Sequence, residues 1–143
     1  MKRTIATVAL VVLGAFAGSA GATKTKPKLP KTLKTPTGNF VTLYHASLPS
    51  GRSTVASFDV GICTSAHTPK GTFAYPPFFT VAVSKGPQVR ISLAAAKSPA
   101  LKMQPMGPKQ CVRGWISFDL PKGVHAIALD YTALGPPIVW KLA

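Results

Sequence analysis

The chain has 143 residues and a formal net charge of +14, with 17 Lys and Arg against 3 acidic residues, all of them Asp. This length suits one folded domain, and a hydrophobic fraction of 46% is too high for a chain disordered throughout. The 14 Pro and 12 Gly disfavour a helical bundle, and so few carboxylates disfavour paired-acid catalysis and all-oxygen metal sites.

Residues 1–22 have the organisation of a secretory signal peptide. Lys2 and Arg3 precede an uncharged apolar run over residues 5–17, and the small residues of GSAGA follow it. This order is typical of an export signal, and the apolar run is shorter than the about 20 residues that a membrane-spanning helix needs. We expect cleavage after Ala22, which places the mature protein in the extracellular space or the cell envelope.

Residues 23–38, TKTKPKLPKTLKTPTG, predict a disordered, extended Lys/Pro-rich linker. Like charges repel one another, and proline fixes φ and removes a hydrogen-bond donor. One interpretation is a solvated spacer; the other is an electrostatic tether to anionic cell-wall polymer or lipid head groups. The lysines that would form the tether are Lys24, Lys26, Lys28, Lys31 and Lys34.

From Asn39 onward, short runs of β-branched and aromatic residues alternate with Pro and Gly. The predicted strands cover residues 40–47, 55–63, 78–83, 88–93, 112–120, 124–131 and 138–142. Short strands without a helical period predict an all-β fold, an immunoglobulin-like antiparallel β-sandwich of about seven strands over residues 39–143.

Two of these strands alternate clearly between apolar and polar residues. Residues 56, 58, 60 and 62 are apolar, whereas Ser57, Asp59 and Gly61 lie between them. Likewise, Ser117 and Asp119 lie between apolar residues 116, 118 and 120. This alternation predicts that one face of the sheet is buried and the other is solvated.

Export favours a disulfide between the two cysteines, Cys63 and Cys111, because exported proteins fold under oxidising conditions. Neither cysteine lies in a metal-binding or nucleophile motif. Side chains alternate between the two faces of a strand, and both cysteines fall on the face opposite to that of their core-facing neighbours. We therefore expect the bridge at a strand end or on an outer face, and not between two sheets.

Residues 107–123, GPKQCVRGWISFDLPKG, resemble a sequence signature of exported actinobacterial immunoglobulin-like proteins. This immunoprotective extracellular protein-like family includes secreted mycobacterial antigens. An aliphatic strand ending in Tyr131, a closing strand with Trp140 and the upstream Cys63 extend the similarity over about residues 55–142. The resemblance implies an immunoglobulin-like fold, export and a disulfide. The family's molecular function is unknown, so the resemblance implies no catalytic residues.

The sequence favours a non-enzymatic protein. Its mature part lacks the G-x-S-x-G, H-E-x-x-H and S-x-x-K motifs. A cryptic hydrolase is the alternative, since a Ser-His-Asp arrangement is recognised by geometry and not by sequence position. The residues that it could use are His45, His67, His125, Asp59, Asp119 and Asp130.

A second alternative is an exported copper-binding protein, because thioether and imidazole ligands suit Cu(I). Met103 and Met106 would bind the metal, completed by His125 or His45. Methionine also commonly fills irregular gaps in a core. No other metal or cofactor is predicted.

Phe73 and Tyr75 precede the Pro76-Pro77 pair, which Phe78 and Phe79 follow. These aromatic residues predict either a platform for a ligand or protein partner, or core packing. No specific nucleic-acid role is predicted, because the lysine-rich tail contains no aromatic residue for base stacking. The sequence thus favours a secreted, non-enzymatic binding domain of unknown molecular role.

Overall fold

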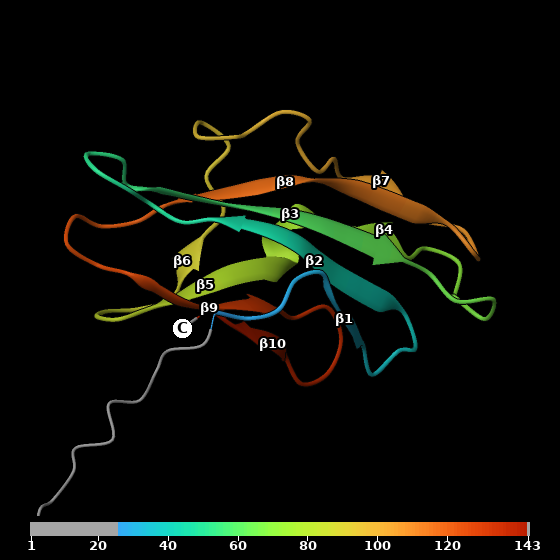
Figure 1. Ribbon diagram of the computed structural model, residues 1–143. Helices are drawn as coiled ribbons and strands as arrows, with labels where there is room; N and C mark the ends of the chain where they lie inside the picture. The colour runs from blue at the N-terminus through green and yellow to red at the C-terminus, as the bar shows by residue number, and fades with distance from the viewer. Residues whose placement is uncertain (1–25, 143) are drawn as a thin grey trace, which may run out of the picture.

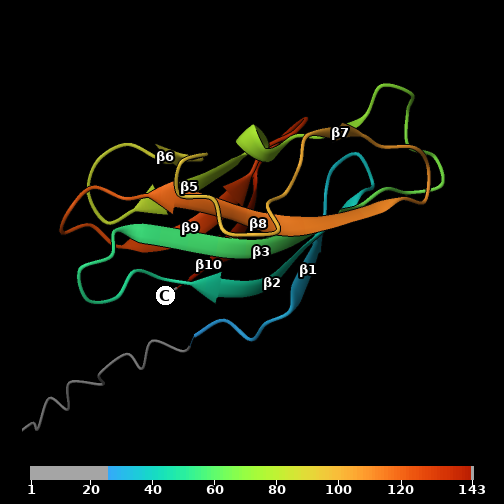
Figure 2. The same ribbon diagram turned by 90° about the horizontal axis from the view of Figure 1, so that it is seen from above.

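The segments rich in β-branched and aromatic residues form two packed antiparallel sheets in the computed structural model, which describes residues 26–142 (Figures 1 and 2). Sheet I has the order β1-β2-β3-β8, and sheet II has the order β10-β9-β5-β6. The predicted β-sandwich is confirmed. The predicted signal peptide and Lys24 lie outside the described residues, and no helix within residues 26–142 is long and apolar enough to cross a membrane.

Strands β2 and β3 have the predicted bounds, whereas β1, β4 and β7 were not predicted and the strand predicted over residues 88–93 is shorter, as β6. Short β4 and β7 pair with each other at the side of the sandwich, and a single 3₁₀ turn, η1, leads into β5. The elements are β1 (Lys31–Lys34), β2 (Phe40–Ser47), β3 (Val55–Cys63), β4 (Phe73–Ala74), η1 (Pro76–Phe78), β5 (Phe79–Val83), β6 (Val89–Arg90), β7 (Gln104–Pro105), β8 (Cys111–Asp119), β9 (Ala126–Tyr131) and β10 (Ile138–Lys141).

The core lies between the two sheets and is built from the apolar positions that the alternation predicts. Phe58 of β3 and Phe118 of β8 are fully buried, and their rings meet edge to face with centroids 5.8 Å apart. Phe79 and Trp140 contribute the largest buried side chains of sheet II. Burying such a side chain contributes about 1.5–3 kcal/mol.

The opposite face of sheet I is not uniformly solvated, contrary to the prediction. Ser57 and Ser117 are buried there, and their hydroxyls share a hydrogen bond of 2.8 Å. Residues 91–101 run along the free edge of β8, where the Ser92 and Lys97 amides donate to Ser117. This segment is visible beside β8 in Figure 2. Asp59 of the same face is also buried, beneath Arg113.

The prediction of a disordered linker over residues 23–38 is wrong for its second half. Lys31–Lys34 form β1, which pairs antiparallel with Phe40–Leu43 of β2. Leu33 packs against the core, and Lys31 and Lys34 are exposed. This is a common composition for an edge strand, whose charged side chains discourage further strand pairing.

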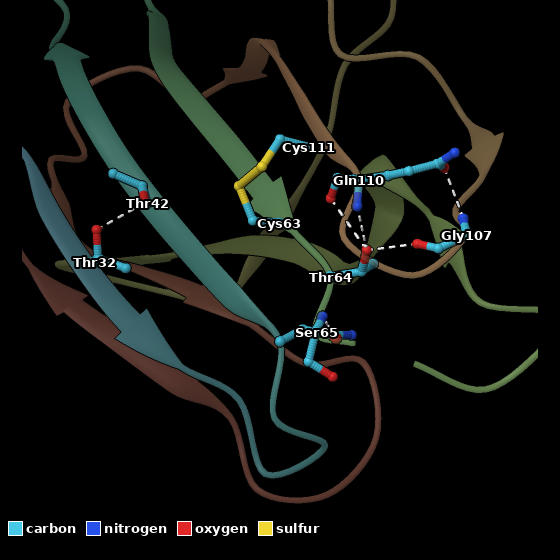
Figure 3. The surroundings of a disulfide bond; sticks show 9 residues. Thr32, Thr42, Cys63, Thr64, Ser65, Gly107, Gln110 and Cys111 are labelled. Atoms are coloured by element: carbon cyan, nitrogen blue, oxygen red, sulfur yellow. Dashed lines mark hydrogen bonds between the residues drawn. A yellow bond between two sulfur atoms is a disulfide. The ribbon is translucent and has the colours of Figure 1, made fainter. Parts of the chain in front are cut away.

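The predicted disulfide between Cys63 and Cys111 is confirmed (Figure 3). The two residues lie directly opposite each other where β3 ends and β8 begins, with Cα atoms 4.1 Å apart. As the parity of the cysteines predicts, the bridge joins neighbouring strands of one sheet and does not cross the core.

Candidate functional site

At the end of the sandwich where β3 finishes, on the right in Figure 1, several loops come together. These loops surround an open pocket. Its volume is about 350 Å³. The β1–β2 loop contributes Thr37 and Asn39, residues 69–73 form a second wall, and Ala133 and Leu134 come from the loop after β9. An apolar pocket of this size is the default place to seek a binding site.

The inner lining of the pocket comes from the ends of regular elements. Ile62 near the end of β3 and Tyr131 at the end of β9 are 2% and 5% exposed, and Phe78 of η1 is partly buried. At the rim, Phe73 and Leu134 are exposed. The pocket therefore joins the core to an exposed apolar surface.

Side-chain hydrogen bonds fix the loop that follows β3. The Thr64 hydroxyl donates to the Gly107 carbonyl at 2.6 Å and accepts from the Gln110 amide at 2.9 Å, next to the disulfide (Figure 3). The Asn39 side-chain carbonyl accepts hydrogen bonds from the Ser65 amide and the Thr68 hydroxyl. The wall formed by residues 69–73 is thus held at its base.

The aromatic residues of β4 and of the segment that follows it have different surroundings, so both interpretations of this cluster apply. Phe79 is fully buried in the core. Phe78 stacks edge to face between Tyr75, at 4.9 Å, and Tyr131, at 6.1 Å. Phe73 and Tyr75 remain exposed, and Phe73 lines the pocket.

Tyr131 is the most unusual polar residue among those that line the pocket. Burial raises the pKa of Tyr131 to about 12, so the phenol stays protonated at neutral pH and can donate a hydrogen bond. The Tyr131 hydroxyl has no hydrogen-bond partner within residues 26–142. In this part of the chain, every fully buried side-chain polar atom does have a partner. The hydroxyl is therefore accessible.

The positive charge lies at the surface. All Lys and Arg side chains among the described residues are exposed, and Arg113 is the one of them that forms an ion pair. Lys26 and Lys28 precede β1 and are exposed, like Lys31 and Lys34 on it. The Lys34 ammonium lies 5.9 Å from the centroid of the Phe40 ring.

Sequence reasoning did not find the cluster on the outer face of sheet I. The Arg113 guanidinium donates to both carboxylate oxygens of Asp59, at 3.0 and 2.7 Å, and lies 3.8 Å from the Tyr44 ring centroid. The hydrogen bond to Asp59 raises the pKa of Arg113. Because both partners are paired, this cluster is a structural feature of the sheet.

Of the residues of the copper alternative, Met103 and Met106 have different surroundings, and His125 lies apart from both. Met106 is buried in the core, whereas Met103 is exposed. Both precede the start of β8, but His125 follows its far end, at the β8–β9 connection on the left in Figure 1. His45 is exposed on β2. Within residues 26–142, no group of three His, Cys, Asp or Glu side chains could hold a metal ion.

The residues of the hydrolase alternative have other partners. Asp59 pairs with Arg113, Asp119 accepts from the Thr54 hydroxyl at 2.6 Å, and Asp130 accepts from the Gln88 amide. In the part of the chain that the structure describes, no histidine side chain makes a hydrogen bond to these carboxylates. The geometry therefore assembles no Ser-His-Asp arrangement there.

Sequence reasoning also missed Tyr131, Lys70 and Leu134 as neighbours around a pocket. The one available signal was the parity of β9, which directs Tyr131 inward together with Leu129. Residues 69–73 and the loop after β9 have no periodic pattern, so their meeting depends on the assembled sandwich.

No protein-family model, curated protein or solved structure matches this chain. Membership of the exported actinobacterial family therefore stays a prediction.

Proposed function

We propose that this chain is a secreted, non-enzymatic binding domain that associates with anionic polymer or lipid head groups of the cell envelope. The observation that carries the proposal is the uncompensated positive surface. The described lysines and arginines are all exposed, whereas Asp59 and Asp130 are buried. The surface thus presents many cations and little negative charge to balance them.

The charges favour association by simple electrostatics. Each lysine near an anionic membrane surface contributes about 1 kcal/mol. Salt reduces this attraction, because the screening length is about 10 Å at 0.1 M ionic strength. Association of this kind should be fast, reversible and sensitive to salt.

The four described lysines nearest the N-terminus are the best candidates for the contact. Lys31 and Lys34 are fixed on the edge strand β1, and Lys26 and Lys28 directly precede it. This arrangement makes the basic segment part of the domain edge, so a bound surface would lie close to sheet I. We therefore propose contact through the edge of the domain and not through a long flexible tether over residues 23–38.

The test is co-sedimentation of the chain from Thr23 to Ala143 with isolated cell-envelope fractions across a salt titration. Vesicles of phosphatidylglycerol in a second arm separate lipid head groups from wall polymer. One variant carries glutamine at residues 26, 28, 31 and 34. The matched control carries glutamine at Lys85, Lys102, Lys122 and Lys141, which are also exposed and give the same net charge.

We expect the N-terminal variant to lose at least tenfold more affinity than the control at 0.1 M salt, because about 1 kcal/mol per lysine accumulates at one surface. Equal losses in both variants would show that net charge alone drives binding. Failure of the unmodified chain to sediment at low salt would contradict the proposal.

A further inference from the structure

The pocket between the loops has an apolar lining and also contains a charged residue and a tyrosine, which a purely apolar ligand would not require. Lys70 is the one charged residue among the described residues that line it, and none of these is acidic. Tyr131 lines the same pocket, 5% exposed and with an unpaired hydroxyl. Because no fully buried side-chain polar atom of the described residues lacks a partner, this hydroxyl is open to a bound molecule.

These groups select the chemistry of the ligand. A protonated phenol that lacks a partner is available as a donor, which favours a ligand with an acceptor. A cationic rim without carboxylates favours negative charge. The apolar residues Ile62, Phe73 and Phe78 favour a hydrocarbon body.

We infer that this pocket binds a fatty-acid-type carboxylate, with its hydrocarbon chain against Ile62, Phe73 and Phe78 and its carboxylate within reach of the Tyr131 hydroxyl and the Lys70 ammonium. Leu134 and Phe73 are 71% and 48% exposed at the rim, and a bound chain would cover this apolar surface. The inference uses different residues from the proposed envelope association, because none of Lys26, Lys28, Lys31 and Lys34 lines the pocket, so separate variants test the two.

The direct measurement is isothermal titration calorimetry of the Thr23–Ala143 chain with dodecanoate below its micelle concentration. Dodecanol and dodecyltrimethylammonium serve as uncharged and cationic ligands with the same hydrocarbon chain. We expect saturable binding of one dodecanoate, with weaker binding of the alcohol and weakest binding of the cation. Vesicles of phosphatidylglycerol, offered in a parallel arm to the variant with glutamine at residues 26, 28, 31 and 34, show whether the pocket instead takes the chain of a membrane lipid.

Two substitutions test the groups that would hold the carboxylate. Tyr131→Phe removes only the hydroxyl and should weaken dodecanoate binding about tenfold or more, since hydrogen bonds to charged groups are the stronger ones. Lys70→Gln should weaken it by about two- to fivefold, because an exposed charge contributes less. The control Lys122→Gln makes the same charge change in the turn between β8 and β9, far from the pocket, and should have no effect.

A second readout uses the unmodified chain and does not depend on how the variants fold. Dodecanoate should shift the amide resonances of Gly71, Thr72 and Leu134 and leave those of residues 121–125 in place. Absence of saturable binding overturns the inference. So does equal affinity for all three amphiphiles, or a preference of the N-terminal lysine variant for vesicle lipid over free dodecanoate. Loss of envelope sedimentation by the N-terminal lysine variant, with dodecanoate binding intact, would leave this inference standing.

Discussion

Asp130 and Tyr131 are neighbours on β9, and both are almost fully buried, on opposite faces of sheet II. Tyr131 points toward the core side, and Asp130 lies on the outer face beside Thr80. The Gln88 amide donates to the Asp130 carboxylate, and within residues 26–142 no cation forms an ion pair with it. Burial raises the pKa of Asp130 because it removes water from the carboxylate.

The raised pKa of Asp130 predicts a loss of stability as the pH rises. An unfolded aspartate titrates near pH 3.9, so between that pH and the higher folded pKa the folded state binds more protons than the unfolded state. The free energy of unfolding therefore falls through this window and stays lower above it. Asp130→Asn removes this loss and should stabilise the protein at pH 7, with a smaller gain at pH 3, as measured by urea unfolding.

The matched control is Asp119→Asn. Asp119 is exposed, and its substitution raises the net charge by the same amount. We expect no such pH-dependent gain from it. If Asp130→Asn destabilised the protein more at pH 7 than at pH 3, the carboxylate would be stabilising in its charged form, and the explanation from burial would be wrong.

At the scale of elements, Gly114 determines how residues 99–101 pack on β8. Trp115 exchanges backbone hydrogen bonds with this segment: its amide donates to Pro99 at 2.8 Å, and its carbonyl accepts from Leu101 at 2.9 Å. A Cβ at position 114 would lie 2.6 Å from the Leu101 Cα and 2.7 Å from the Ala100 carbonyl carbon. Only glycine leaves room for so close a backbone contact.

Gly114→Ala should therefore force the backbone of residues 99–101 away from β8. We expect it to lower the free energy of unfolding by about 1–3 kcal/mol, the usual range for overpacking a core. The control is Gly61→Ala on β3, where the added Cβ would meet the tip of the Tyr44 ring. A ring can move more easily than a backbone, so this change should cost less. Equal costs, measured by urea unfolding, would contradict the role of Gly114.

The sequence predicted the strands better than the segments that cover them. Strands β2 and β3 have the predicted bounds because their alternation reflects burial of one face. The strand predicted over residues 88–93 ends at Arg90 in β6, and residues 91–101 instead attach to β8 through backbone groups, which leave no pattern in the sequence. β1 was missed because lysine and proline dominate its neighbourhood, and its pairing needs only the backbone and one packed leucine, Leu33.

The pocket was less predictable than the fold. Phe73 and Tyr75 were singled out by composition, yet Phe73 alone of the two lines the pocket. Tyr131 and Leu134 are distant in sequence from Lys70, and they meet it only because the two sheets bring the ends of β3 and β9 together. Such proximity follows from topology, which the pattern of one sequence does not contain.

On the scale of the whole molecule, the two sheets are tied together where their edge strands β1 and β10 approach each other. The Trp140 indole N–H of β10 donates to the Lys31 carbonyl of β1 at 3.1 Å, and Trp140 is 1% exposed. Gly135, in the loop before β10, also packs against Pro36 in the loop after β1. β1 therefore helps to close one side of the sandwich, and the folded domain begins before Asn39.

This closure predicts different outcomes for two truncations. A chain that starts at Leu29 keeps β1 and should match the Thr23–Ala143 chain within about 0.5 kcal/mol, as surface changes usually do. A chain that starts at Asn39 leaves the buried Trp140 N–H without its acceptor and exposes the surface that Leu33 covers. An unsatisfied buried donor costs about 1–3 kcal/mol, so we expect a loss of about 2 kcal/mol or more in the free energy of unfolding.

Urea unfolding followed by tryptophan fluorescence measures this difference, and a red shift in the native state of the shorter chain would report water reaching Trp140. Equal stability of the two truncated chains would show that β1 does not hold the sandwich closed. The expected result also bears on the envelope experiment. If removal of residues 23–38 loosens the sandwich, lost binding by that chain cannot be assigned to its lysines, and the glutamine variants are needed because they remove charge and keep β1.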